Sequence, residues 1–345
     1  MSDSFGSALY ETPPILSSWD DLLEGISGIQ DWKLRRIDLQ RRFLELLRDT
    51  VKPPKPLLDL QIEETVVIAD SYERLSIIYA VEAGERVHAY LGIPLNLIGP
   101  TPAVVALHGT TAQGTEQTVG LSGDPNKAYL DPLCRKGFIV IAPEHFSSGR
   151  RIPPEGPYDT AHFYRKHPEW TAVGKSTFEN SIAIDVLQSL PQVDSSRIGC
   201  MGHSLGGHGS FFLAAYDERV TAVAGNCAGG TFRHSLDVEL WARDHWYVYF
   251  KHLRPLILAR QPLPIDLHEI IALIAPRAFL DLSALNDGDS ASQHQRVLMM
   301  LKLAELYALL DQSGQFSFFV HGQGHSMPLE SRQLIEGFLS ARLTS

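Results

Sequence analysis

The pentapeptide Gly202-His203-Ser204-Leu205-Gly206 sets a serine between glycines, an arrangement that can present a hydroxyl nucleophile. An apolar run, Ile198–Met201, precedes the pentapeptide, and a helix-like stretch begins near Gly206. A serine on a tight strand-to-helix turn projects its hydroxyl beyond the sheet edge, and the turn needs flanking residues with almost no side chain. The first N–H groups of the helix face the same space. The pattern predicts that Ser204 attacks a carbonyl carbon.

A serine hydroxyl needs a base to take its proton, and the base needs a carboxylate to orient it. Asp287 stands a few residues after the apolar run Ala278–Leu282. His325 stands in a glycine-containing loop after the apolar run Phe316–Val320. The chain order of serine, aspartate and histidine, each after a predicted strand, predicts a catalytic triad of Ser204, Asp287 and His325.

Three nearby residues are alternatives to these assignments. His321 competes with His325 for the role of base, and the loop context favours His325. Asp289 is the alternative to Asp287 as the acid. Asp281 falls inside the predicted strand and is interpreted as structural.

Attack on a carbonyl produces a negative oxygen, which is stabilised by two backbone N–H donors. The residue after the nucleophile supplies one donor, so the first is the N–H of Leu205. The predicted strand Ala103–Leu107 leads into a loop that begins at His108. We assign the second donor to the N–H of Thr110, with Gly109 as the alternative, and expect His108 to brace this loop.

Short apolar segments, separated by helical patterns, must position these residues. Three extended segments come first and indicate an antiparallel start to a sheet: Thr65–Ala69, Leu75–Val81 and Arg86–Ile93. The later strands are predicted at Ala103–Leu107, Phe138–Ile141, Ile198–Met201, Val220–Ala224, Ala278–Leu282 and Phe316–Val320. Helical patterns cover Phe178–Leu190, Val297–Leu310 and Ser331–Leu343. This alternation predicts an α/β fold with a mostly parallel central sheet and helices on both faces.

The chain divides into a helical N-terminal extension, residues 1–60, and a catalytic domain, residues 61–345. The extension carries a helical pattern from about Trp19 to Leu47, which two prolines, Pro53 and Pro54, bring to an end. Within the catalytic domain, residues 229–271 interrupt the alternation with a group of aromatic residues. We expect a small cap there, in which the aromatic residues mainly form packed core.

Composition narrows the function classes. The 345 residues carry 30 basic and 40 acidic side chains, a formal charge of −10, which argues against nucleic-acid binding. The cysteines Cys134, Cys200 and Cys227 are odd in number and widely spaced, which argues against a disulfide framework. We see no leader peptide, membrane span, metal motif or nucleotide-binding motif, so we expect a cytoplasmic enzyme without cofactor or metal. The sequence is compatible with a homo-oligomer.

Several further stretches resemble one group of proteins. They are Tyr90–Pro94 followed by Pro102–Thr110, then Gly137–Glu144, Leu190–Gly199 and Ala275–Leu280. Together with the serine pentapeptide they resemble the α/β-hydrolase superfamily, and within it enzymes like dienelactone hydrolases and acetyl xylan esterases. The resemblance covers most of the chain. It implies an α/β-hydrolase fold and a serine hydrolase that needs no cofactor, with Ser204 as nucleophile, Asp287 as acid and His325 as base.

Three positions depart from related patterns. Dienelactone hydrolases commonly use cysteine as the nucleophile, so Ser204 indicates the esterase side of the group. Glu144 stands where aspartate is usual, and we interpret it as structural. Leu205 stands where the similar glucuronoyl esterases have arginine, which argues against their substrate.

The resulting expectation is a carboxylic ester hydrolase that acts on a small acyl ester or a carbohydrate ester. Two alternatives remain. A prolyl-oligopeptidase-like peptidase would have a similar catalytic domain, but the stretch before Pro102 is too short for the large gating domain of such enzymes. A non-catalytic ligand-binding relative would typically lack a member of the triad.

Overall fold

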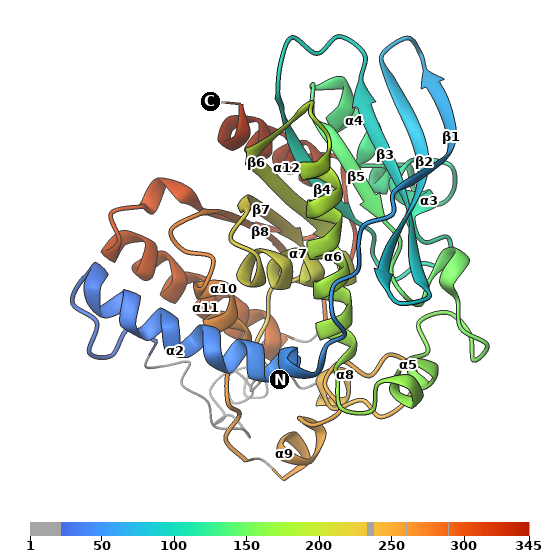
Figure 1. Ribbon diagram of the computed structural model, residues 1–345. Helices are drawn as coiled ribbons and strands as arrows, with labels where there is room; N and C mark the ends of the chain where they lie inside the picture. The colour runs from blue at the N-terminus through green and yellow to red at the C-terminus, as the bar shows by residue number, and fades with distance from the viewer. Residues whose placement is uncertain (1–21, 233–237, 260, 289, 345) are drawn as a thin grey trace.

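A computed structural model of the protein describes residues 22–344, apart from 233–237, 260 and 289 (Figure 1). Its centre is a nine-stranded sheet with the order β1-β2-β3-β5-β4-β6-β7-β8-β9. The strands are β1 (Gln61–Ile68), β2 (Tyr72–Glu82), β3 (Glu85–Pro94), β4 (Thr101–Leu107), β5 (Ile139–Pro143), β6 (Val193–His203), β7 (Val220–Asn226), β8 (Ala278–Ala284) and β9 (Phe316–His321).

The sheet has an antiparallel part and a parallel part. The pairs β1–β2, β2–β3 and β3–β5 are antiparallel, whereas β5, β4, β6, β7, β8 and β9 run parallel. The carboxyl ends of the parallel strands therefore meet at one edge of the sheet, where residues from distant parts of the chain come together.

Alternate residues of each parallel strand face two separate apolar layers. In β4, Ala103, Val105 and Leu107 belong to one buried cluster, while Val104 and Ala106 belong to the other. This two-sided burial explains why the strands appear in the sequence as continuous apolar runs. Helices α6 and α7 cover the first layer, and α4 and α12 cover the second (Figure 1).

The helices with more than one turn connect or flank these strands. They are α2 (Ile29–Leu47), α4 (Leu130–Arg135), α5 (Ala161–Lys166), α6 (Ala172–Ser189), α7 (Leu205–Tyr216), α9 (Arg254–Leu258), α10 (Leu267–Ala272), α11 (Ser290–Leu309) and α12 (Leu329–Leu343). Two single turns are α3 (Thr115–Thr118) and α8 (Val238–Trp241). None of the helices that the structure describes is long and apolar enough to cross a lipid bilayer.

Helix α2 lies across the ends of other helices (Figure 1). Its buried Phe43 stacks on Phe212 of α7 at a centroid distance of 6.0 Å. The Leu47 carbonyl accepts a hydrogen bond of 2.9 Å from the Thr171 hydroxyl, just before α6. The Arg36 guanidinium donates to the Leu273 carbonyl at 3.1 Å. These contacts join the N-terminal part of the chain to the layer that covers the sheet.

The strand predictions are confirmed, because all nine expected segments are strands and the first three are antiparallel. The predicted mostly parallel sheet with helices on both faces is also confirmed. The predicted ends of the helices were less accurate. The pattern from Trp19 places the N-terminal helix too early, since α2 begins at Ile29 and Trp19 lies outside the described residues. Helix α11 begins seven residues before the predicted Val297, at Ser290.

Candidate active site

Ser204 sits on a sharp turn between β6 and α7. Its backbone has φ 57° and ψ −122°, a region that residues with a side chain rarely adopt. A Cβ atom on Gly206 would lie 2.2 Å from the Leu107 carbonyl oxygen, and one on Gly202 would lie 2.3 Å from the Gly206 carbonyl carbon. The two glycines therefore allow the backbone to pack closely enough to hold Ser204 in this turn.

The hydroxyl of Ser204 is the first member of a hydrogen-bonded chain of three side chains. The distance from Ser204 Oγ to His325 Nε2 is 2.8 Å. On the other side of the imidazole ring, the distance from His325 Nδ1 to Asp287 Oδ2 is also 2.8 Å. The imidazole can therefore accept the serine proton at Nε2 while its Nδ1–H donates to the carboxylate. The structure thus brings together the three side chains that the sequence suggested as a triad.

The carboxylate of Asp287 is held in its charged form. Partial burial would raise the pKa of Asp287, but the hydrogen bond from His325 and the positive charges of His325 and Arg296 outweigh that effect. The pKa of Asp287 therefore lies below its ordinary value, and the group is ionised at neutral pH. An ionised carboxylate stabilises the positive imidazolium that forms when His325 takes a proton.

The loops that carry the acid and the base are tied to each other and to the turn at Ser204. The Asn286 side-chain oxygen accepts a hydrogen bond of 2.8 Å from the Gly324 N–H. The Asn226 side-chain amide donates to the Ser326 carbonyl at 2.7 Å and contacts His203 Nδ1 at 2.7 Å. Because burial lowers the pKa of His203 to about 3, its ring is neutral and can accept this bond. Asn226 therefore connects the base loop with the residue before the nucleophile.

Two backbone N–H groups are available near the nucleophile. Leu205 begins α7, so its N–H has no acceptor within the helix. Gly109 lies against the serine, because a Cβ added to it would be 3.7 Å from the Ser204 Cβ. The next residue, Thr110, makes no backbone hydrogen bond to another described residue. Leu205 and the Gly109–Thr110 stretch therefore lie beside Ser204, and both Thr110 and Gly109 stay open as the second donor.

The loop around Gly109 is braced by two buried side chains. His108 Nδ1 lies 2.8 Å from the Gly109 carbonyl oxygen, and His108 Nε2 accepts the His145 N–H at 3.0 Å. The hydroxyl of Tyr158 accepts the Thr111 N–H at 2.9 Å and lies 3.1 Å from the Gly109 oxygen. His108 therefore contacts the loop as expected, whereas the sequence analysis did not single out Tyr158.

Cys227 lies beside the acid and the base. Its Sγ atom, a carboxylate oxygen of Asp287 and a ring nitrogen of His325 all lie within 4.8 Å of one another. Burial and the charge of Asp287 raise the pKa of the Cys227 thiol to about 12, so it is protonated at neutral pH. Cys227 directly follows β7, and its place at a strand end is the signal that could have identified it from sequence.

Comparison with known proteins finds similarity to esterases and to a hydrolase. The model of a family described as "Glucuronyl esterase, fungi" matches residues 157–310. YtaP of Bacillus subtilis (strain 168), a protein named as a hydrolase, is 26% identical over 231 residues, which are 65% of this chain and 74% of that protein. Carbohydrate esterase MZ0003, from an unknown prokaryotic organism, is 28% identical over 168 residues, which are 45% of this chain and 38% of that esterase.

The fold agrees with these sequence matches. The structure of a glucuronoyl esterase from Solibacter usitatus matches with a TM-score of 0.71 at 17% identity, covering 96% of this chain and 98% of that one. The chain has an α/β-hydrolase fold. The resemblance inferred from its motifs is confirmed, and the family and relatives support a carboxylic ester hydrolase.

The other candidate residues lie in different surroundings. His321 ends β9, where its Nδ1 accepts the Gln323 N–H at 3.2 Å, and no hydrogen bond joins it to Ser204 in the described part of the chain. Asp281 is fully buried in β8 and accepts the Ser283 hydroxyl at 2.5 Å. Asp289 lies outside the described residues. The geometry thus favours Asp287 and His325 over these alternatives.

Glu144 is enclosed by backbone. Its carboxylate accepts the Arg150 N–H at 2.9 Å. A Cβ on Gly149 would lie 1.7 Å from a Glu144 oxygen, so a glycine is required beside it. These contacts agree with the structural role expected for Glu144.

The aromatic residues of the expected cap mostly form packed core. Trp241, Tyr247, Tyr249 and Phe250 are buried, while Trp246 is 40% exposed. The Trp246 carbonyl accepts the Thr160 N–H at 2.9 Å. In Figure 1, α8 and α9 lie at the same end of the molecule as α5. This part of the chain therefore packs on the segment that contains α5.

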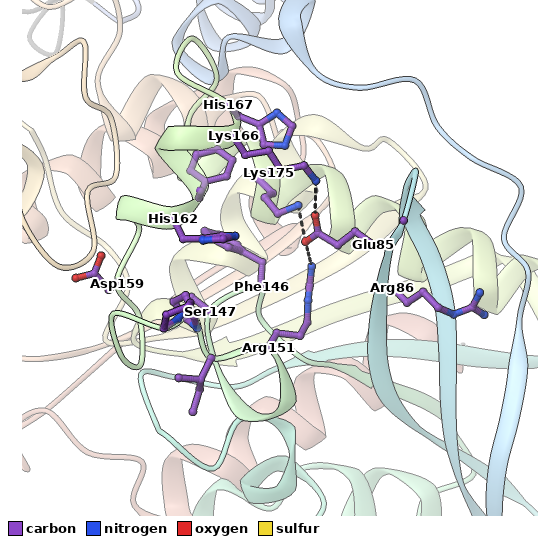
Figure 2. A pocket seen from close by; sticks show the side chains of 15 residues that line it. Glu85, Arg86, Phe146, Ser147, Arg151, Asp159, His162, Lys166, His167 and Lys175 are labelled. Atoms are coloured by element: carbon purple, nitrogen blue, oxygen red, sulfur yellow. Dashed lines mark hydrogen bonds and ion pairs between the residues drawn. The ribbon is translucent and has the colours of Figure 1, made fainter.

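A cavity of about 430 Å³ lies between the β2–β3 turn and α5 (Figure 2). Figure 2 shows Glu85 pointing towards the cationic groups of Lys175 and Arg151. Lys175 Nζ lies 2.9 Å from Glu85 and 2.8 Å from Glu179, and Arg151 lies 2.6 Å from Glu179. These buried charges neutralise one another, so the cluster joins the hairpin to α6 rather than offering a free charge to a ligand.

Proposed function

We propose that the protein hydrolyses carboxylic esters of carbohydrates through an acyl-enzyme intermediate on Ser204. The observation that carries this proposal is the continuous hydrogen-bonded chain from Ser204 through His325 to Asp287. The family model supports the choice of an ester, and the carbohydrate esterase relative supports a carbohydrate substrate. The His325 side chain is 50% exposed, so the imidazole that contacts Ser204 is open to solvent.

In the acylation step, His325 Nε2 takes the proton of Ser204 as Oγ attacks the ester carbonyl carbon. Asp287 holds the ring in the required tautomer and stabilises the imidazolium. The N–H groups of Leu205 and Thr110 stabilise the oxyanion, an effect worth about 3–4 kcal/mol per donor in a well-studied protease. The imidazolium then gives its proton to the departing alcohol.

In the deacylation step, water replaces the alcohol. His325 takes a proton from the water as its oxygen attacks the acyl carbon. The tetrahedral intermediate collapses, the carboxylic acid leaves, and Ser204 Oγ recovers its proton from His325. No cofactor enters either step.

Residues 229–271 and the loop from Thr110 to Asn126 are proposed to shape the substrate pocket. The first segment packs on α5, and the second begins at the proposed oxyanion donor. Leu205 brings no positive charge to the position after the nucleophile, so the proposed oxyanion site relies on backbone N–H donors. We therefore expect acyl groups carried by sugars to be better substrates than esters of uronic acids.

A fluorophosphonate probe with mass spectrometry tests the nucleophile. We expect one label, on Ser204, and hydrolysis of p-nitrophenyl acetate that Ser204→Ala abolishes. Ser326→Ala is the matched control, because Ser326 lies next to His325 and its hydroxyl donates, among the residues that the structure describes, to the Gln323 carbonyl. Turnover retained in Ser204→Ala would overturn the mechanism.

A panel of substrates tests the substrate class. Acetylated xylo-oligosaccharides should have a higher kcat/KM than alkyl acetates of similar size, and methyl glucuronate should be poorer. Equal values for sugar and alkyl acetates would overturn the carbohydrate assignment. Faster cleavage of aminoacyl p-nitroanilides than of esters would indicate a peptidase instead.

A further inference from the structure

We infer that the active site also forms a binding site for a soft divalent cation such as Zn²⁺, whose ligands are Cys227, His325 and Asp287. Binding there would inhibit the enzyme. The inference rests on the proposed function in one respect, because inhibition is observed as a loss of ester hydrolysis.

The three ligand atoms come from three separate segments that meet at the edge of the sheet. Cys227 directly follows β7, Asp287 lies after β8, and His325 lies after β9. One sulfur, one nitrogen and one oxygen lie within 4.8 Å of one another. A tetrahedral zinc site with bonds of about 2.0–2.3 Å needs its ligand atoms roughly 3.3–3.8 Å apart. Small side-chain rotations would therefore complete the site.

The backbone keeps the Cys227 sulfur in this place. Cys227 has φ 53°, and its N–H donates to the Leu282 carbonyl at 2.8 Å. Its Sγ lies 3.8 Å from the Ser326 carbonyl oxygen and 3.9 Å from the Gly324 carbonyl oxygen, both in the loop that carries the base. The sulfur is thus held between the end of β7 and this loop, close to Asp287 and His325.

The charges around the site favour a cation. Asp287 is itself a ligand, and the carboxyl group of Asp281 also acts on Cys227 electrostatically. Arg296 opposes them with one positive charge. A thiolate favours Zn²⁺ over Mg²⁺ and Ca²⁺, which prefer sites made only of oxygen ligands. The mixed ligand set therefore predicts selectivity as well as binding.

Binding would remove the base from the reaction. The metal takes the lone pair of His325 Nδ1, so the ring proton moves from Nδ1 to Nε2. The S–H bond of Cys227 breaks, its proton goes to solvent, and a metal–sulfur bond forms. His325 Nε2 then carries a proton and cannot accept the one on Ser204 Oγ, while Asp287 is bound to the metal and no longer orients the ring.

The test combines inhibition with direct binding. Zn²⁺ should inhibit p-nitrophenyl acetate hydrolysis, EDTA should restore it, and Mg²⁺ at the same concentration should have no effect. In Cys227→Ser and Cys227→Ala, each compared with its own metal-free rate, the Zn²⁺ concentration for half-inhibition should rise at least about tenfold, as for loss of a metal-site residue. Unchanged inhibition in both variants would overturn the inference.

Calorimetry with Zn²⁺ on Ser204→Ala separates this inference from the proposed function, because that variant keeps all three ligands but lacks the nucleophile. One bound Zn²⁺, lost in Ser204→Ala/Cys227→Ala, supports the site whatever the reaction. Absence of Zn²⁺ binding overturns the site, even if Ser204 proves to be the nucleophile. Thermal melts of each variant show whether it is folded.

Discussion

Removing the hydroxyl of Tyr158 should slow catalysis by loosening the loop at Gly109. This hydroxyl accepts the Thr111 N–H at 2.9 Å and lies 2.9 Å from the Thr111 oxygen and 3.1 Å from the Gly109 oxygen. Burial raises the pKa of Tyr158 to about 12, so the phenol keeps the proton that it donates to one of these carbonyls. Tyr158→Phe therefore removes a donor and an acceptor from a buried position without changing the ring.

The size of the effect follows from these bonds. Each buried group left without a partner costs about 1–3 kcal/mol. Complete loss of one oxyanion donor costs about 3–4 kcal/mol of transition-state stabilisation, and this is the upper limit for the effect of Tyr158→Phe on the activation free energy. Since each 1.4 kcal/mol is a factor of ten, we expect kcat to fall about 10- to 100-fold. KM should change little, because the loop acts mainly on the transition state.

The assay measures kcat and KM on p-nitrophenyl acetate, together with the rate of fluorophosphonate labelling. Tyr164→Phe is the control: the Tyr164 hydroxyl is also buried and donates to the Val248 carbonyl at 3.0 Å, but it does not contact the Gly109 loop. The control should lose stability while its kcat stays within about twofold. A Tyr158→Phe enzyme with wild-type kcat, or an equal fall in both variants, would show that the hydroxyl has no specific positioning role.

Four more substitutions test other parts of the structure. Gly206→Ala should prevent a stable fold, because its Cβ would lie 2.2 Å from the Leu107 carbonyl oxygen. In the control Gly337→Ala, the Cβ would have no atom within 4 Å, and the protein should gain about 0.5–1 kcal/mol in the free energy of unfolding. Urea denaturation measures both changes. Burial raises the pKa of Asp281 to about 6, so ionisation of Asp281 destabilises the fold as pH rises from about 4 to 6. Asp281→Asn should therefore raise the Tm at pH 8. A gain in Tm that did not shrink below pH 6 would contradict this reasoning. Lys175→Ala should cost about 3–5 kcal/mol in urea denaturation, because it breaks a buried ion-pair cluster, and a loss under 1 kcal/mol would argue against that role.

The sequence was sufficient to predict the parallel sheet and the three clustered side chains for a physical reason. Strands buried on both faces appear in the sequence as continuous apolar runs, so the sequence shows where each strand ends. The residues that follow parallel strands lie together at one edge of the sheet. Ser204, Asp287 and His325 each follow such an end. The same rule places Cys227 at the site, since it follows β7, yet a single cysteine after a strand has no distinctive pattern.

Other parts depended on contacts that local patterns do not encode. Tyr158 lies in a loop with φ 60° and reaches residues about 50 positions away, so no periodicity identifies it. The ion pairs of Glu85 with Arg151 and Lys175 join segments 66 or more residues apart. The start of α2 was placed too early because apolar spacing continues through the turn before Ile29. Helix ends depend on the first backbone bonds, which the apolar pattern does not report.

The wide spacing of the active-site residues has a consequence for synthesis of the chain. The serine and the base are 121 residues apart, and the base follows β9, the last strand and one edge of the sheet. Strands β6, β7, β8 and β9 pair in the order in which they leave the ribosome, so the sheet can grow by one neighbour at a time. The nucleophile is present early in this sequence, but its partner arrives only with the final strand. Hydrolysis is therefore expected only from chains that have completed the sheet, and the onset of activity during translation should report the moment at which β9 docks.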